Sequence, residues 1–260
     1  MDLGLKGKKA VITGGSKGIG LATALLLAGE GADVAIIART LEPLQEAARR
    51  IAEATGREPL IVQADISSEE GAREAVEKAA GYFGGLDILV NNAGTSAAKP
   101  FEEVDGASWD ADLDLKLLAA VHCSRAAIPH MRDAGGGAIV NVTAVKGKAP
   151  SESSLPTSVS RAAGLALTKA MSRDLAGANI RVNAVCIGLI RSNQIEKKWK
   201  QAAPQLSWEE FSADPRHNIP LGRIGDAREA ANVIGFLVSE AASYVTGTAV
   251  NIDGGSSAVL

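Results

Sequence analysis

The chain has 260 residues, 46% of them hydrophobic, and a formal net charge of −3. Its length and apolar content suit one large α/β domain, while the small net charge and the lack of a basic run argue against nucleic-acid binding. The polar start and the absence of an apolar stretch of ~18 residues argue against secretion and a membrane span, so we expect a soluble, cytoplasmic protein. Cys123 and Cys186 are expected to be core residues of a protein in a reducing compartment, and no metal site is expected.

Short apolar runs alternate with longer helical patterns along the whole chain. We expect strands at 9–13, 34–38, 60–62, 86–90, 138–142, 180–185 and 249–252, and helices near 18–29, 44–52, 67–83, 107–133 and 157–176. The strands are continuous apolar runs, as in a parallel sheet that helices cover on both faces. This alternation predicts a Rossmann-type, doubly wound α/β fold with about seven parallel strands and a single domain over residues 1–260.

A glycine-rich segment joins the first strand to the first helix. Glycines there let the backbone turn sharply and approach a pyrophosphate, while free amides at the helix N-terminus receive its negative charge. The residues expected to take part are Gly14, Ser16, Lys17, Gly18, Ile19 and Gly20. Alone, this string would equally describe a tight strand–helix turn, so the nucleotide interpretation depends on matches elsewhere.

Those matches occur at the right intervals, and with them the chain resembles the short-chain dehydrogenase/reductase family over essentially its whole length. The segments concerned are Asp65 with Ile66, Asn91–Gly94, Gly188 to Ser192, Ser243–Gly247 and Asp253–Gly255. The resemblance implies that Asp65 and Ile66 lie at the adenine, and that Asn91, Ala93 and Gly94 lie near the adenosine ribose. It also implies that Gly188, Ile190 and Ser192 lie beside the nicotinamide, although Ile187 replaces the usual Pro.

The end of the second strand indicates which nicotinamide cofactor binds. NAD-dependent members carry an acidic residue there for the ribose 2′-hydroxyl, whereas this chain has Ala38 followed by Arg39. A guanidinium pairs with a 2′-phosphate, and Lys17 adds a second cation nearby. We therefore predict NADP(H) as the cofactor; the alternative is that both cations are solvated surface charges.

The segment Thr157–Ala163 resembles the family's Tyr-Ser-x-Ser-Lys-Ala-Ala motif, with Thr157 at the position of the proton-donating Tyr and Arg161 at that of the Lys. Counting back thirteen residues places Ala144 where the family has a substrate-orienting Ser. The segment around Trp109 places Lys116 where it has an Asn that holds a relay water. The resemblance thus implies that all four catalytic positions are substituted.

The four substitutes differ in what they can do. Thr157 is too weak an acid to replace Tyr and can only hydrogen-bond, while Ala144 contributes nothing polar. Arg161 can hold ribose hydroxyls and stabilise an anion, but it does not release a proton. Lys116 is the favoured acid, because burial and a neighbouring cation lower a lysine pKa. The alternative is a helix-surface lysine whose ammonium reaches water.

Several other polar residues are interpreted conservatively. Residues 193–217 resemble a substrate lid, or else an ordinary pair of surface helices. We expect solvated loop charges at Lys146, Lys148 and Glu152. His122 and His130 lie on the helix that the family uses in subunit packing, and His217 lies in the lid segment. Tyr82 and Tyr244 are expected to lie outside the pocket. The helices at 107–133 and 157–176 resemble those that form family tetramers. Their small residues, Ala119, Ala120, Ala126 and Ala127, would allow close packing in a homotetramer.

Three functions fit this pattern. The first is an NADP(H)-dependent oxidoreductase that acts on a small organic substrate with a non-standard proton donor. The second is a catalytically silent NADP-binding protein. The third is a non-redox enzyme on the same fold, similar to halohydrin dehalogenases, which also carry Arg at the Lys position but keep the Tyr and Ser. Without a Tyr acid, polarised C=C bonds, iminium ions and vicinal diketones are the easiest redox substrates.

Overall fold

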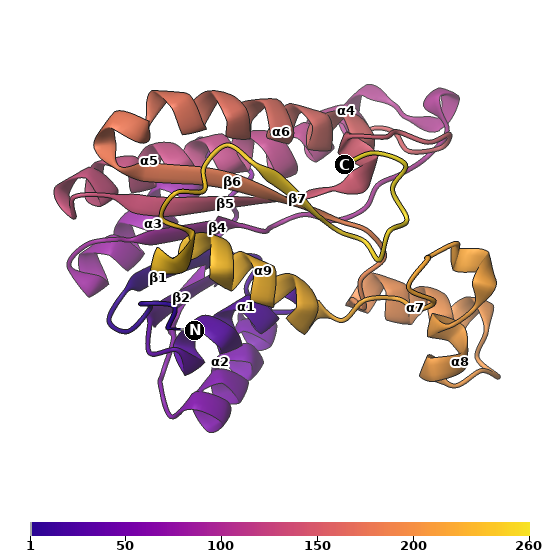
Figure 1. Cartoon of the computed structure of the whole chain (residues 1–260), viewed down its shortest axis with the longest axis horizontal. Helices are drawn as coiled ribbons and strands as arrows, with labels where there is room; N and C mark the ends of the chain where they lie inside the picture. The colour runs from indigo at the N-terminus through magenta and orange to yellow at the C-terminus, as the bar shows by residue number, and fades with distance from the viewer. Residues whose placement is uncertain (1) are drawn as a thin grey trace.

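The structure is a computed structural model that describes residues 2–260. Within that range seven strands form one parallel sheet, in the order β3-β2-β1-β4-β5-β6-β7 (Figure 1). They are β1 (Lys9–Thr13), β2 (Asp33–Ala38), β3 (Leu60–Gln63), β4 (Ile88–Asn91), β5 (Gly137–Ala144), β6 (Ile180–Ile187) and β7 (Ala249–Ile252). The doubly wound α/β fold predicted from the sequence is confirmed, with strand bounds that agree to within two residues.

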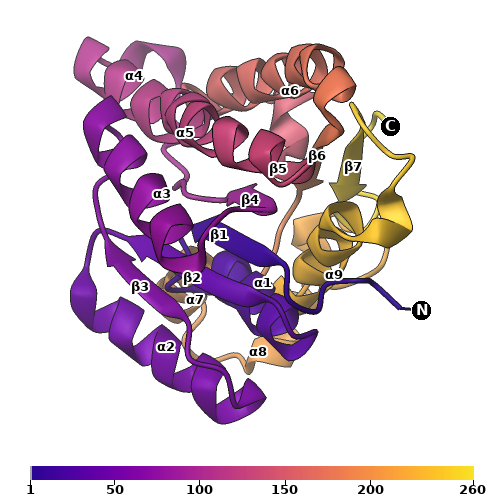
Figure 2. The ribbon, with the colours of Figure 1, turned by 90° about the vertical axis from the view of Figure 1, so that its left-hand side faces the viewer.

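Helices cover both faces of the sheet (Figure 2). One face carries α1 (Gly18–Gly29), α2 (Leu41–Thr55) and α9 (Ala227–Val238), and the other carries α3 (Glu69–Phe83), α5 (Ala119–Asp133) and α6 (Thr157–Asp174). Each face has its own apolar core, with Leu27 and Ile36 fully buried on the α1 side and Val76 and Leu89 on the α3 side. Because both faces are covered, the strands are apolar throughout.

Helix α9 was not among the helices predicted from the sequence. Its signal was present, since Asp226 accepts from the Arg228 amide and Glu229 accepts from the Asp226 amide to form a capping box at the helix start. An acidic residue three positions after an N-cap is a recognisable start signal. The helix packs against α1 and supplies Ala230 and Ile234 to the core.

The long helix predicted over 107–133 is interrupted. It consists of α4 (Gly106–Leu113), a π-helical turn (Asp114–Leu118) and α5. Such turns insert extra backbone into a helix and occur often at functional sites. Lys116 lies in the middle of this turn, so the direction of its side chain could not be derived from ordinary helical spacing.

Four alanines expected at a subunit interface instead face the protein's own core. Ala119, Ala120, Ala126 and Ala127 are at most 8% exposed, and three of them pack in the apolar cluster beneath α3 and α5. They therefore allow α5 to approach its own sheet. These alanines therefore do not support the prediction of a homotetramer, whose subunit interface would have to be formed by other residues.

The strand order reverses between β1 and β4, because the chain runs outward to β3 before returning to pair β4 with β1. Ligands of doubly wound sheets bind outside the carboxyl ends of the strands at such a point. The segments after β1 and β4 contain the glycine-rich turn and Asn91–Gly94. No helix among residues 2–260 is long and apolar enough to cross a membrane.

Candidate active site

The turn after β1 has the geometry of an anion-binding loop. Gly14 and Gly18 have φ of +65° and +54°, values that favour glycine. A Cβ on Gly20 would lie 2.3 Å from the Gly14 carbonyl oxygen, so the helix approaches the turn as closely as its backbone allows. Lys17, the N-cap of α1, makes no side-chain capping bond. The first amides of α1 are thus available to an anion.

The two asparagines after β4 have different tasks. Asn92 donates through Nδ2 to the carbonyl oxygens of Thr13 and Gly14, at 2.9 and 3.2 Å, and so fixes the glycine-rich turn. Asn91 points into the protein, where its Nδ2 donates to Ser124 Oγ and Asn141 Oδ1. The Asn91 side chain therefore belongs to a buried network between β4 and β5, and the expected place near the adenosine ribose stays a prediction for its backbone.

At the expected adenosine end, Asp65 and Arg39 are exposed and lie on adjacent strand ends. Asp65 accepts from the amide and the hydroxyl of Ser67, and these bonds, with a smaller contribution from Arg39, lower the pKa of its carboxyl. Only the backbone oxygen of Arg39 is engaged, by Gln63 Nε2 at 3.0 Å. The charges of Arg39 and of the exposed Lys17 are therefore accessible to a ligand.

At the expected nicotinamide end, backbone segments pack closely. A Cβ on Gly188 would lie 2.7 Å from Asp253 Cβ, and one on Gly94 would lie 2.8 Å from an Arg161 terminal nitrogen. Ser192 caps α7 (Asn193–Ala202) by accepting from the Ile195 amide at 3.4 Å, and Ile190 pairs with Gly225. These contacts hold the segment after β6 beside the sheet end.

Lys116 is buried, so the interpretation as a surface lysine reaching water is wrong. Its side chain is 0% exposed and forms an ion pair with Asp112, whose side chain is 2% exposed. Its Nζ also donates to Thr157 Oγ1 at 2.9 Å. The π-helical turn directs Lys116 inward, toward the N-terminus of α6.

The surroundings of Lys116 shift its proton affinity. Removal from water lowers the pKa of the ammonium, the hydrogen bond and charge of Asp112 oppose that shift, and the charge of Arg161 adds to it, so that the pKa is lowered overall. Both causes foreseen from the sequence, burial and the Arg161 charge, are present. The counteracting carboxylate of Asp112 was not foreseen.

Arg161 borders the same cluster from the first turns of α6. It donates to the Val142 carbonyl oxygen at 2.6 Å, while its Nε is buried without a hydrogen-bond partner. Burial lowers the pKa of its guanidinium to about 10 against the influence of Asp112, so that it remains charged at neutral pH. A buried donor without a partner is costly, which makes Arg161 suited to hold ribose hydroxyls.

Two groups with no role predicted from the sequence complete the cluster. Asp112 accepts from Lys116 and, through Oδ2, from Ser160 Oγ at 2.6 Å. The amide of Ala97, in the loop after β4, donates to Thr157 Oγ1 at 3.1 Å. The i, i+4 relation of Asp112 and Lys116 was visible in the sequence, whereas the Ala97 contact crosses 60 residues.

The remaining polar candidates lie outside this cluster. Lys148 is not a solvated loop charge, because its Nζ donates to the Ala249 carbonyl oxygen and to Asn251 Oδ1 on β7. Lys146 and Glu152 are exposed, as are Tyr82 and Tyr244. His130 pairs with Glu77, His217 contacts the Phe211 carbonyl oxygen, and His122 has a buried Nδ1 without a partner.

Among residues 2–260 no group of three or more His, Cys, Asp or Glu side chains is placed to hold a metal ion. Both cysteines are buried in the core, as predicted.

The 193–217 segment contains α7, α8 (Trp208–Ser212) and a short turn at Pro215–His217, and it projects beyond the sheet (Figure 1). Trp199, Trp208 and Phe211 pack together with ring centroids 5.6–6.5 Å apart, and the Arg191 guanidinium lies 4.4 Å from the Trp208 ring. Gln194 Oε1 accepts from the Ser96 amide at 3.3 Å. The segment thus has an aromatic core of its own and contacts the loop after β4.

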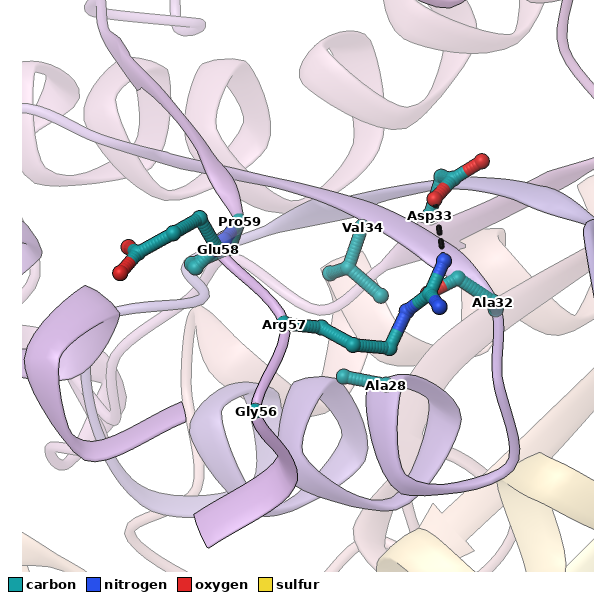
Figure 3. Close-up of a pocket in the computed structure, with 8 residues that line it drawn as sticks. All are labelled: Ala28, Ala32, Asp33, Val34, Gly56, Arg57, Glu58 and Pro59. Atoms are coloured by element: carbon teal, nitrogen blue, oxygen red, sulfur yellow. Dashed lines mark hydrogen bonds and ion pairs between the residues drawn. The ribbon is translucent and has the colours of Figure 1, made fainter. Parts of the chain in front are cut away.

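A separate pocket of about 220 Å³ lies at the opposite end of the sheet, near the start of β2 (Figure 3). Arg57 crosses it to pair with Asp33 at 2.5 Å and to donate to the Ala32 carbonyl oxygen. None of the predicted site residues lines it. Its Arg57 and Asp33 side chains pair with each other, so we assign the pocket no role in the chemistry.

Comparisons with known proteins agree with this fold. Residues 14–257 match the family model described as enoyl-(acyl carrier protein) reductase. The chain is 36% identical to cis-4-hydroxycyclohexanecarboxylate dehydrogenase of Sinomonas cyclohexanicum, with 96% of each chain covered. The structure resembles L-sorbose reductase of Gluconobacter frateurii, solved with NADPH and L-sorbose, with a TM-score of 0.95, 37% identity and full coverage of both chains.

A short-chain oxidoreductase of Pseudomonas aeruginosa PAO1, described as containing an atypical catalytic center, is similarly close. It superimposes with a TM-score of 0.94 and 34% identity over the whole of both chains.

A seven-stranded doubly wound sheet with a nucleotide-binding turn at its switch point defines a dinucleotide-binding α/β protein. The chain belongs to the short-chain dehydrogenase/reductase family.

Proposed function

We propose that this protein is an NADP(H)-dependent oxidoreductase that acts on a small organic substrate and uses Lys116 in place of the family's tyrosine as its proton donor. One observation carries the proposal: the Lys116 ammonium is fully buried and lies 2.9 Å from the hydroxyl of Thr157, which stands at the tyrosine position. A buried ammonium with a lowered pKa is a better proton donor than a solvated one.

The residues present fit an NADP(H) molecule along the carboxyl edge of the sheet. The free amides of α1 would receive the pyrophosphate, Arg39 and Lys17 the 2′-phosphate, and Arg161 the nicotinamide ribose, where its unpartnered Nε would gain an acceptor. When bound, the cofactor supplies or accepts a hydride. Relatives of 33–37% identity, the sorbose reductase and the Pseudomonas oxidoreductase, have been solved with NADPH, which supports the same choice here.

The protein's own groups support proton transfer. Asp112 holds the Lys116 ammonium in place and Ser160 holds Asp112, so the acid has one defined position. Arg161 remains charged and stabilises negative charge that develops on a substrate oxygen. Ala144 offers no hydrogen bond to the substrate, whose orientation therefore depends on other groups.

A silent NADP-binding protein is the second candidate. It is favoured by the apolar side chain at Ala144 and by the absence of a strongly acidic hydroxyl at Thr157. The presence of a buried, oriented lysine beside Thr157 favours the enzyme instead, because burying an ion pair has a desolvation cost that a function would explain.

The test has two stages. NADPH and NADH binding are first measured by cofactor fluorescence. NADPH oxidation is then followed at 340 nm with 2,3-butanedione, 2-cyclohexenone and a cyclic imine. Turnover with any of them supports the proposal, and Lys116→Met is then expected to slow it by ~10²–10⁴-fold. Tight NADPH binding without oxidation, combined with turnover only in the variant Lys116→Asn, Ala144→Ser, Thr157→Tyr and Arg161→Lys, would favour the silent protein.

A further inference from the structure

The Thr157 hydroxyl oxygen accepts two hydrogen bonds from the protein. One comes from Lys116 Nζ at 2.9 Å and the other from the Ala97 amide at 3.1 Å. Thr157 is 8% exposed, so both bonds are largely shielded from water. A hydroxyl oxygen has two lone pairs, and both are therefore occupied.

The direction of these bonds follows from the donors. A backbone amide can only donate, and a lysine ammonium has no lone pair, so neither partner can accept the Thr157 proton. The hydroxyl hydrogen must lie in the remaining tetrahedral direction, away from Lys116 and Ala97. Donation by a charged group to the oxygen polarises the O–H bond and strengthens it as a donor.

We infer that Thr157 is a catalytic residue that relays a proton from Lys116 to the substrate. This rests on the proposed function, and it adds to it the group that touches the substrate. Thr157 need not ionise, because its oxygen gains a proton from Lys116 as it releases its own. The weak acidity that disqualifies a threonine as the sole acid is therefore no obstacle.

The step balances for a carbonyl substrate. The carbonyl carbon gains the hydride, and the carbonyl oxygen forms a bond to the Thr157 hydrogen as the O–H bond of Thr157 breaks. Thr157 Oγ1 forms a new bond to a Lys116 hydrogen, whose N–H bond breaks and leaves a neutral amine. Lys116 must be reprotonated before the next turnover, so that one proton is consumed in each reduction.

The charges of the cluster limit the substrate class. Lys116 and Arg161 carry two positive charges against the one negative charge of Asp112; the Lys116 and Asp112 side chains are enclosed by protein and Arg161 is partly buried. Such a site stabilises a substrate that gains negative charge on oxygen and disfavours a cation. We therefore expect activated carbonyl compounds and conjugated enones rather than iminium ions.

The test compares Thr157→Val, which keeps the shape and removes the hydroxyl, with Thr157→Ser, which keeps the hydroxyl. NADPH oxidation with 2,3-butanedione is the activity measurement, with Lys116→Met as reference. A relay predicts that Thr157→Val loses ~10²–10⁴-fold in turnover, as Lys116→Met does, while Thr157→Ser stays within about tenfold of the parent protein. All variants should bind NADPH with unchanged affinity.

A second measurement needs no substrate. The pKa of Lys116 is followed in the cofactor-free protein by NMR of its ε-carbon. Loss of an acceptor from the ammonium should lower that pKa further in Thr157→Val but not in Thr157→Ser. An unchanged Lys116 pKa in Thr157→Val, or near-normal turnover of Thr157→Val in an active enzyme, would overturn the relay. An inactive parent protein with all three substrate types would instead overturn the proposed function.

Discussion

Ser160 donates a 2.6 Å hydrogen bond to Asp112 across a separation of 48 residues. This contact joins α6 to the end of α4, and the second carboxylate oxygen of Asp112 holds Lys116 in the adjoining π-helical turn. The acidic side chain therefore links the two elements that contribute the proposed proton donors. Several expected properties of the protein depend on it.

Removal of Lys116 should affect stability as well as chemistry. Lys116→Met leaves the Asp112 carboxylate buried without its cation, and breaking a buried pair in this way typically costs about 3–5 kcal/mol. We expect a lower midpoint in urea denaturation. The matched control adds Asp112→Asn, which removes the stranded charge and should recover most of the loss. If Lys116→Met alone were as stable as the parent protein, the Asp112 carboxyl would have to be neutral or solvated in that variant.

The pH dependence of reduction should follow the protonation of Lys116. Burial lowers the pKa of its ammonium, with Asp112 opposing the shift and Arg161 adding to it, so turnover should fall as pH rises through this lowered value. Asp112→Asn removes the opposing carboxylate and should move the falling limb to lower pH. Arg161→Gln removes a neighbouring cation and should move it to higher pH. The measurement is kcat against pH at saturating NADPH; a shift of both variants in one direction would contradict the assignment.

The fold and the turn after β1 could be predicted from sequence because they depend on local patterns. Continuous apolar runs define the strands, and the glycines after β1 must lie where the backbone turns. The resemblance of the segment around Trp109 put Lys116 at a catalytic position, and the structure brings its Nζ to 2.9 Å from Thr157 Oγ1. Its partner Asp112 was not recognised, although it lies only four residues away, because a carboxylate in a helix is usually solvated.

What the sequence could not show depends on contacts between distant segments. The π-helical turn was not visible in the helical pattern of residues 107–133, yet it turns Lys116 inward. The Ala97 amide reaches Thr157 through a loop whose path depends on the whole sheet. The alanines of α5 looked equally suitable for a neighbouring subunit and for the sheet, and only the packing distinguishes them. Lys148 was assigned to solvent for the same reason, since its acceptors lie 101 and 103 residues away on β7.

Cofactor preference should depend on Arg39. Its guanidinium is exposed at the end of β2, with no carboxylate at the preceding Ala38 to repel a 2′-phosphate. We expect NADP(H) to bind more tightly than NAD(H) by ~1–3 kcal/mol, and Arg39→Asp to reverse the preference. Fluorescence titration with both reduced cofactors measures this. Lys146→Asp, which places the same charge change on an exposed loop, is the control. Equal affinity of the parent protein for the two cofactors would contradict the prediction.

Assembly should depend on exposed apolar residues near the site helices. Leu118, at the end of the π-helical turn, and Val159, in the first turn of α6, are 39% and 43% exposed. We expect a homotetramer with a mass about four times 26.7 kDa, because closed symmetry lets each such surface be buried against its counterpart. Leu118→Glu with Val159→Glu places charges in that interface and should reduce the mass seen by light scattering at micromolar concentration. Tyr82→Glu, at an apolar position 72% exposed near the end of α3, should leave it unchanged. A parent protein that scatters as a monomer would rule out the tetramer, and a tetramer that survives the double substitution would place its interface elsewhere.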